Sequence, residues 1–148
     1  MPLHKDLREF IASLNSHHVD YLIVGAFALA FHGVPRYTGD IDILVRATPE
    51  NAAHVDQVLK EFSFASLGLS AVDFLQPEHV IQLGYPPNRI DLLTSITGVQ
   101  FEDAWAKRVS GELHGIEVYF IGRDSLIQNK KATGRTQDKA DLEALEAR

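Results

Sequence analysis

Two aspartates interrupt a stretch that otherwise has the composition of a buried β-strand. The stretch is HGVPRYTGDIDILV, from His32 to Val45, and the aspartates are Asp40 and Asp42. Aspartate is depleted in strands, and residues two apart in a strand point to the same face, about 7 Å from each other. The pair therefore directs two negative charges at one place, which disfavours joint ionisation unless a cation neutralises them.

A divalent metal ion is a cation that suits such a pair. Mg²⁺ takes hard oxygen ligands and usually binds one or two carboxylates together with substrate phosphates. Asp91, in RIDLL, is a third aspartate flanked by strand residues, and it completes the site if its strand neighbours the one that carries Asp42. We therefore predict Asp40, Asp42 and Asp91 as metal ligands and as catalytic residues.

A lone Asp-x-Asp pair also has a simpler interpretation, in which Asp40 caps the turn after Gly39 and Asp42 is a solvated residue at the start of a strand. The surroundings favour chemistry instead. The pair follows a strand, a glycine turn and a helix, and a third strand aspartate matches it. A single glycine turn remains weak evidence by itself, because glycine serves tight turns in many proteins.

The residues around this turn are candidates for binding nucleotide phosphates. The helix predicted after the turn at Gly25 and Ala26 exposes free backbone N–H groups and the positive end of its dipole, which suit a phosphate. Arg36 and Thr38 lie just upstream of the aspartate pair. Arg36 and Lys130 are candidates to neutralise phosphates, the arginine by bidentate contact and the lysine as a point charge, although either also fits an ordinary surface charge.

Hydrophobic spacing predicts the elements that position these residues. Predicted strands cover residues 21–24, 41–45, 79–83, 89–93, 109–113 and 116–121. Predicted helices cover residues 3–14, 27–31, 49–62, 101–107 and 124–132, with a last helix capped by Thr136. The segment 63–78 has no clean period and is predicted as a short helix or loop. Strands mixed with helices, two pairs of them joined as hairpins, predict an α+β fold.

Composition limits the class of protein. With 148 residues, 45% of them hydrophobic, the chain suits one domain over residues 1–148. The net charge of −6 gives no basic field that would gather nucleic acid, and the lack of cysteine excludes disulfides, thiolate metal sites and a cysteine nucleophile. No apolar run reaches the roughly 20 residues that span a bilayer, and the N-terminus lacks a signal-peptide core, so we expect a cytoplasmic protein without membrane contact.

These motifs resemble those of the DNA polymerase β-like nucleotidyltransferase superfamily, and in particular its small stand-alone members found in toxin–antitoxin loci. The resemblance rests on the strand, turn and helix of LIVGAFALAFHG, the strand TGDIDILV and the later carboxylate in RIDLLT. It extends to SLIQNKKATGRTQDKADLEAL near the C-terminus, which resembles the lysine-containing helix and Gly-Arg-x-x-Asp-x-x-Asp segment of the small members. The residues Arg135, Asp138 and Asp141 in this segment are also spaced for local ion pairs, and we interpret them as mainly structural.

The resemblance implies a nucleotidyltransferase-like mixed β-sheet flanked by helices. It also implies that Asp40 and Asp42 bind two divalent ions, Mg²⁺ or Mn²⁺, and that Asp91 helps to activate the attacking hydroxyl. The reaction would move NMP from an NTP such as ATP to a hydroxyl of RNA (tRNA included), protein or a small molecule. A toxin–antitoxin partner protein belongs to the same expectation.

Two other functions remain open at this stage. The second turn residue is Ala26, where the family usually has glycine or serine, so phosphate contact there falls to the backbone N–H. This departure leaves room for a nucleotide-binding, antitoxin-like partner with degraded catalysis. A metal-dependent phosphohydrolase, which would use the same carboxylates with water as acceptor, is the other alternative.

Overall fold

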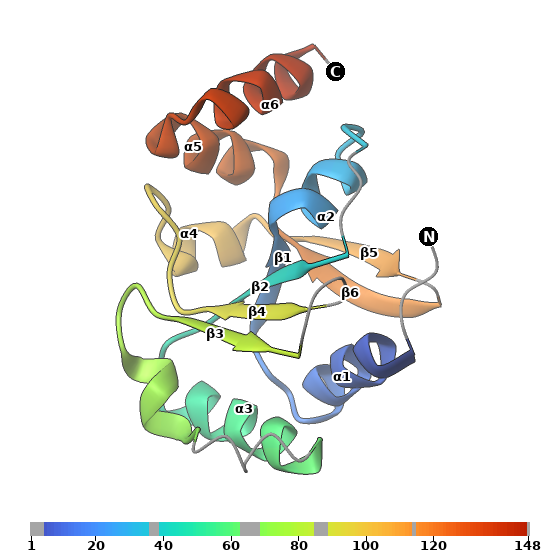
Figure 1. Ribbon diagram of the computed structural model, residues 1–148, viewed down its shortest axis with the longest axis vertical. Coiled ribbons are helices and arrows are strands. Elements are labelled where there is room, and N and C mark those ends of the chain that lie inside the picture. Colours follow the sequence, from blue (N-terminus) through green and yellow to red (C-terminus); the bar gives the residue numbers. More distant parts are fainter. Residues whose placement is uncertain (1–4, 36–38, 63–68, 85–88, 114, 148) are drawn as a thin grey trace.

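The strands form one mixed sheet with helices on both faces (Figure 1). The computed structural model of the protein describes residues 5–35, 39–62, 69–84, 89–113 and 115–147. The strands are β1 (Tyr21–Val24), β2 (Ile41–Val45), β3 (Val80–Leu83), β4 (Ile90–Leu93), β5 (Val109–Leu113) and β6 (Ile116–Phe120). The helices are α1 (Lys5–Ser16), α2 (Gly25–Phe31), α3 (Pro49–Glu61), the 3₁₀ helix η2 (Ala71–Leu75), α4 (Phe101–Ala106), α5 (Arg123–Thr133) and α6 (Thr136–Glu146).

The strand order is β3-β4-β2-β1-β6-β5, so the sheet brings together strands that are far apart in the sequence. The central strands β1 and β2 are antiparallel, whereas β2 pairs with β4 and β1 pairs with β6 in parallel. The hairpins β3–β4 and β5–β6 close the two sides of the sheet. The α+β fold with a mixed sheet, predicted from the sequence, is thereby confirmed.

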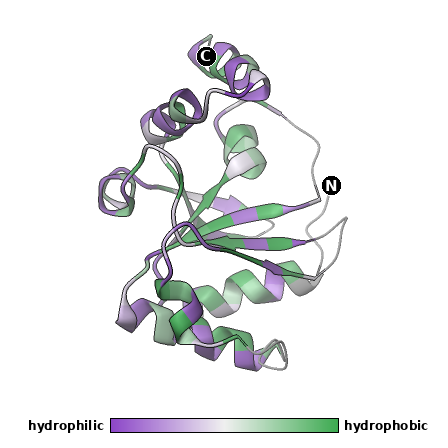
Figure 2. Cartoon of the chain, turned by 60° about the vertical axis from the view of Figure 1, so that its left-hand side comes forward, coloured by the Kyte–Doolittle hydropathy of each residue, from purple (hydrophilic) through white to green (hydrophobic). Residues whose placement is uncertain are grey.

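Burial on both faces explains why the central strands are almost continuously apolar. All four residues of β1 are buried, and β2 departs from full burial at Asp42. Helices α1 and α3 lie on one side of the sheet, and α2, α5 and α6 lie on the other (Figure 1). Hydrophilic segments interrupt the hydrophobic central strands, and α5 and α6 are largely hydrophilic (Figure 2). A charged residue in such a strand is costly to bury unless it is paired.

Local signals set several helix ends. Thr48 caps α3, with its side chain accepting a hydrogen bond from the backbone of Asn51, and Pro49 is the first helical residue. Gly134 ends α5 in the left-handed conformation, with φ of 64°. The expected cap of the last helix is wrong by one residue. Arg135 is the N-cap of α6, where its backbone N–H is bound by the carboxylate of Asp138, and Thr136 is the first helical residue.

The hydrophobic segment that has no clean period contains a 3₁₀ helix. Part of it, residues 63–68, lies outside the described residues, and the remainder holds η2, which buries Phe74. Short 3₁₀ turns give too few residues for a period to emerge, and the sequence could not distinguish this helix from a loop. Within the described parts of the chain, no helix is both long and apolar enough to cross a membrane.

Candidate active site

The parallel pairing of β2 with β4 places two of the predicted carboxylates side by side. Asp42 and Asp91 are direct partners in the register, so their side chains leave the same face of the sheet. Their carboxyl groups share a hydrogen bond. Asp40 lies two residues before Asp42, immediately ahead of β2, and its charge also acts on Asp42. The structure therefore brings together all three aspartates that the sequence singled out.

Burial and like charge make Asp42 hard to ionise. Loss of solvent raises its pKa to about 6, and the neighbouring charge and hydrogen bond of Asp91 add to this effect, followed by the charge of Asp40. The positive charge of Arg89 acts in the opposite direction. Near neutral pH the site thus holds several negative charges in a confined volume, which is the electrostatic condition for binding a cation.

The side chain of Arg89 neutralises part of this charge. Its Nε lies 2.8 Å from Oδ1 of Asp91 and its Nη2 lies 3.1 Å from Oδ2, so the guanidinium forms a two-pronged contact with one carboxylate. The same Nη2 lies 3.5 Å from Oδ2 of Asp40, and the backbone N–H of Arg89 donates to Oδ1 of Asp40 at 3.1 Å. The hydrogen bond to Asp91 raises the pKa of the guanidinium, which stays charged.

Gly25 closes the other side of the site. It follows β1 directly, has φ of 66°, and a Cβ at this position would overlap the carboxylate of Asp42. Both the left-handed backbone and the close approach therefore require glycine. Ala26, the next residue, lies in the first turn of α2 and has no hydroxyl to offer a phosphate.

The remaining predicted site residues are placed differently. Arg36 and Thr38 lie outside the described residues. Lys130 is buried between α5 and α6, where its ammonium lies 3.3 Å from Asp138 and 3.2 Å from Asp141. Its predicted contact with phosphate stays a prediction, since the contacts seen here tie two helices together.

The donor set suits a hard divalent cation, because carboxylate oxygens are the ligands that Mg²⁺ and Mn²⁺ prefer. In the described parts of the chain, no group of three or more histidine, aspartate or glutamate side chains stands ready-made around a metal position. Instead, the guanidinium of Arg89 contacts both carboxylate oxygens of Asp91 and one carboxylate oxygen of Asp40.

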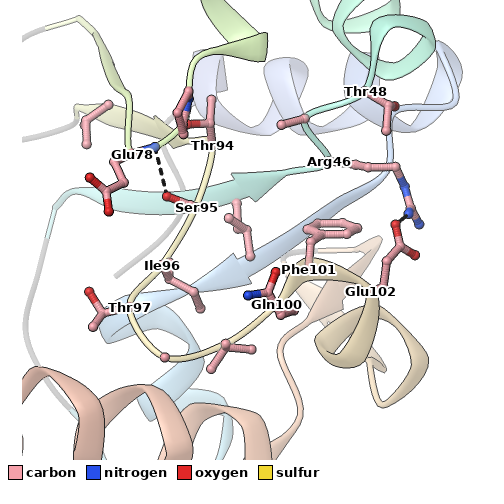
Figure 3. Close-up of a pocket in the computed structure, with 16 residues that line it drawn as sticks. Arg46, Thr48, Glu78, Thr94, Ser95, Ile96, Thr97, Gln100, Phe101 and Glu102 are labelled. Atoms are coloured by element: carbon pink, nitrogen blue, oxygen red, sulfur yellow. Dashed lines mark hydrogen bonds and ion pairs between the residues drawn. The ribbon is translucent and has the colours of Figure 1, made fainter.

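A hollow of about 880 Å³ lies at the opposite ends of the same strands (Figure 3). Its lining includes the residues that follow β2 and those that follow β4, whereas the three aspartates lie where these strands begin. Arg46 lies four positions after Asp42 along the strand, or roughly 13 Å away. Arg46 is bound to Glu102 at the rim of this hollow, and Ser95 accepts a hydrogen bond from the backbone N–H of Glu78 (Figure 3). The hollow is thus separate from the acidic site.

Comparison with protein families gives a match over nearly the whole chain. Residues 3–147 match the family described as nucleotidyltransferase of unknown function, DUF6036. The chain belongs to this family. Membership in this family agrees with the resemblance of the sequence motifs to the DNA polymerase β-like superfamily. It identifies neither the substrate nor a metal. No curated protein matches the chain.

Solved structures share the fold of this nucleotidyltransferase family member. A candidate nucleotidyltransferase from Thermotoga maritima aligns with a TM-score of 0.62 and 18% identity, over 97% of this chain and 92% of the other. The lincosamide antibiotic adenylyltransferase LnuA, solved with lincomycin bound, gives 0.56 and 13%, over 99% and 98%. An antigenic nucleotidyltransferase-like protein from Paracoccidioides brasiliensis gives 0.54 and 18%, over 98% and 78%. At these identities the similarity concerns the fold.

Arg89 is the residue of the site that sequence reasoning missed. The sequence pattern predicts Arg89 as the first residue of a strand and assigns it no further role. A signal was present, because Arg89 stands two residues before Asp91 and residues at this spacing in a strand share a face. In this chain the Arg-x-Asp spacing places a guanidinium beside the carboxylate of Asp91.

Proposed function

We propose that this chain is a divalent-metal-dependent nucleotidyltransferase that moves NMP from an NTP to a hydroxyl acceptor. The observation that carries the proposal is the direct pairing of Asp42 with Asp91, with Asp40 beside them and Gly25 against the carboxylate of Asp42. Family membership supports the reaction class. Carboxylates at paired positions of β2 and β4 serve no evident packing purpose, because the other residues of these two central strands are apolar.

Asp40, Asp42 and Asp91 are the residues that would hold the metal ions. When bound, two such ions supply charge stabilisation for the attacking and leaving oxygens of an in-line displacement. In that displacement the acceptor oxygen forms a bond to the α-phosphorus of the NTP, the bond from this phosphorus to the bridging oxygen breaks, and pyrophosphate leaves. Asp91 would accept the proton of the hydroxyl, which needs a carboxylate that is ionised at neutral pH.

The phosphates would lie next to the turn after β1. Backbone N–H groups of Gly25 and Ala26 are free to donate there because the first residues of a helix have no intrahelical acceptor. Arg36 and Thr38 would complete the phosphate contacts. Ala26 lacks a hydroxyl, and binding at this point relies on the backbone.

Transfer of label from an α-labelled NTP tests this function. The protein is incubated with Mg²⁺ and with acceptors of three classes, namely RNA, protein and small hydroxyl compounds. We expect Asp42→Asn to reduce transfer by about a thousandfold or more, because a group acting in the transition state is lost while the shape is kept. The matched control is Asp124→Asn on α5, where the aspartate side chain is 80% exposed, and it should leave transfer within about twofold.

The outcomes separate the proposed function from its alternatives. Failure of the wild-type protein to label any acceptor contradicts nucleotidyl transfer. Release of phosphate from NTP without an acceptor would instead identify a phosphohydrolase. Binding of NTP by calorimetry with no release of pyrophosphate would identify a nucleotide-binding module whose catalysis has been lost. Circular dichroism of Asp42→Asn confirms that any loss of transfer is not a loss of folding.

A further inference from the structure

Arg89 lies against two of the three carboxylates that are predicted to hold a metal ion. Its side chain is 26% exposed, and it contacts the carboxylate of Asp91, which is 11% exposed, and that of Asp40, which is 34% exposed. The two-pronged contact with Asp91 has nitrogen–oxygen distances of 2.8 and 3.1 Å. Charge-assisted contacts of this geometry are among the stronger side-chain interactions in proteins.

The main chain at Arg89 is held by hydrogen bonds that do not involve its side chain. The backbone N–H of Arg89 donates to Asp40, and its carbonyl accepts a hydrogen bond from the N–H of Ile41 at 3.0 Å. These bonds anchor the start of β4 to β2. Rotation of the Arg89 side chain therefore releases Asp91 without disturbing the strand register.

We propose that Arg89 is the resident counter-ion of the acidic site and that a divalent cation has to displace its guanidinium from Asp91 before it can use this carboxylate. The inference rests on the proposed function, because it takes Asp91 as a metal ligand. The proposal adds Arg89 as a residue that sets the metal affinity of the site. Arg89 is thus a positioning residue, acting through Asp91.

The guanidinium of Arg89 and a divalent cation compete for Asp91 because both are positively charged. A guanidinium and a divalent ion that share one carboxylate repel each other at short range, and the low exposure of Asp91 weakens screening of that repulsion by water. The ion pair and the metal are therefore linked, and each lowers the affinity of the site for the other. The protein without metal gains stability from Arg89, and the protein with metal does not need it.

Binding of Mn²⁺ alone, without nucleotide, tests the proposal. Titration followed by electron paramagnetic resonance gives the affinity of the wild type, of Arg89→Gln and of Arg89→Lys. We expect Arg89→Gln to bind Mn²⁺ about tenfold more tightly, within the usual range for coupled sites, and Arg89→Lys to lie between it and the wild type. Arg108→Gln is the matched control, because this arginine stacks on Trp105 away from the site and its loss changes the net charge equally.

Thermal unfolding supplies a second readout. Without metal, Arg89→Gln should unfold at a lower temperature than Arg108→Gln, and addition of Mn²⁺ should restore more stability to Arg89→Gln than to the control. Equal or weaker Mn²⁺ binding by Arg89→Gln, with binding by the wild type intact, overturns the inference and leaves the proposed function standing. Absence of Mn²⁺ binding in both proteins overturns the metal assignment of the proposed function together with the inference. Should Arg89→Gln fail to fold, Arg89→Lys carries the same comparison.

Discussion

At the scale of residues, the acidic site depends on how neighbouring carboxylates are neutralised. Asp42 and Asp91 share a hydrogen bond, Asp40 adds a third charge, and Arg89 supplies the positive charge that the described residues bring to them. An arginine can neutralise carboxylates and still leave their oxygens as ligands once it moves. The site is therefore partly neutralised without metal and still chemically suited to one.

The raised pKa of Asp42 predicts a pH-dependent stability. Its folded-state pKa of about 6 exceeds its ordinary value of 3.8, so the folded protein holds the proton more tightly and loses stability as pH rises between these values. Asparagine cannot ionise. In EDTA at pH 7.5 we expect Asp42→Asn to be more stable than the wild type by up to about 3 kcal/mol, because the pKa rises from 3.8 to about 6 and one pKa unit corresponds to about 1.4 kcal/mol.

Urea unfolding at pH 7.5 and pH 4.5 measures this difference. The advantage of Asp42→Asn should shrink at the lower pH, where the wild-type carboxyl is protonated. A variant that is less stable than the wild type at pH 7.5 without metal would show that Asp42 is not strained by its neighbours.

Gly25 makes a second prediction at this scale. In Gly25→Ala the new Cβ meets the Asp42 carboxylate at a left-handed backbone position. Gly134→Ala is the matched control, because its φ of 64° is similar and the nearest heavy atom to its Cβ, the carbonyl oxygen of Lys131, lies 4.0 Å away. We expect Gly134→Ala to cost about 1 kcal/mol and Gly25→Ala at least about 1 kcal/mol more, measured by urea unfolding. Equal costs would mean that the close approach of Asp42 has no energetic weight.

At the scale of elements, the site is created by pairing between strands that are distant in sequence. The strands 21–24 and 41–45 were predicted at the bounds the structure gives, because apolar runs bounded by glycine and polar residues mark them locally. The pairing of β2 with β4 and its register could not be predicted from the sequence. The reason is that β4 begins more than 40 residues after β2 and parallel pairing leaves no local pattern. The sequence thus supplied the three aspartates, and the tertiary structure decided that they meet.

The sequence was less informative for residues whose role depends on tertiary contacts, because hydrophobic periodicity does not reveal such contacts. Arg89 was overlooked because its charge gains meaning from Asp40, on another segment. The sequence likewise does not reveal that Lys130 lies against Asp138 and Asp141, so it predicts a phosphate contact without these two ion pairs. The ion pairs add a structural role for Lys130, and its contact with phosphate stays a prediction.

The α5–α6 pair predicts the effect of removing Lys130. In Lys130→Met the ammonium is lost, and Asp138 and Asp141 stay buried with less positive charge near them. Arg135 still binds Asp138, and this hydrogen bond holds the pKa of Asp138 well below its usual range. We expect a loss of about 3 kcal/mol in the free energy of unfolding, as for other broken buried ion pairs.

The same variant separates structure from phosphate binding. If Lys130 serves mainly to join α5 and α6, the folded fraction of Lys130→Met should keep the wild-type KM for NTP. A higher KM at unchanged stability would contradict the structural role and assign Lys130 to the phosphates. Lys60→Met, which removes a 64% exposed lysine on α3, controls for the change in charge.

At the scale of the whole molecule, the acidic site and the hollow lie at opposite ends of strands β2 and β4. The acidic site lies where β2 and β4 begin, and the hollow shown in Figure 3 lies beyond their other ends. The net charge of −6 attracts a metal cation and repels a nucleotide anion. Entry of the nucleotide together with metal removes this conflict, because the metal neutralises phosphate charge.

The most direct measurement of the central claim is the position of the metal itself. A crystal soaked with Mn²⁺ and a non-hydrolysable NTP analogue would be measured for anomalous scattering. We expect manganese peaks within bonding distance of the carboxylates of Asp40, Asp42 and Asp91, with the guanidinium of Arg89 moved away from Asp91 and the phosphates against the turn at Gly25. Manganese bound elsewhere on the chain, or nucleotide bound while Arg89 keeps its contacts with Asp91 and no metal lies beside it, would contradict it.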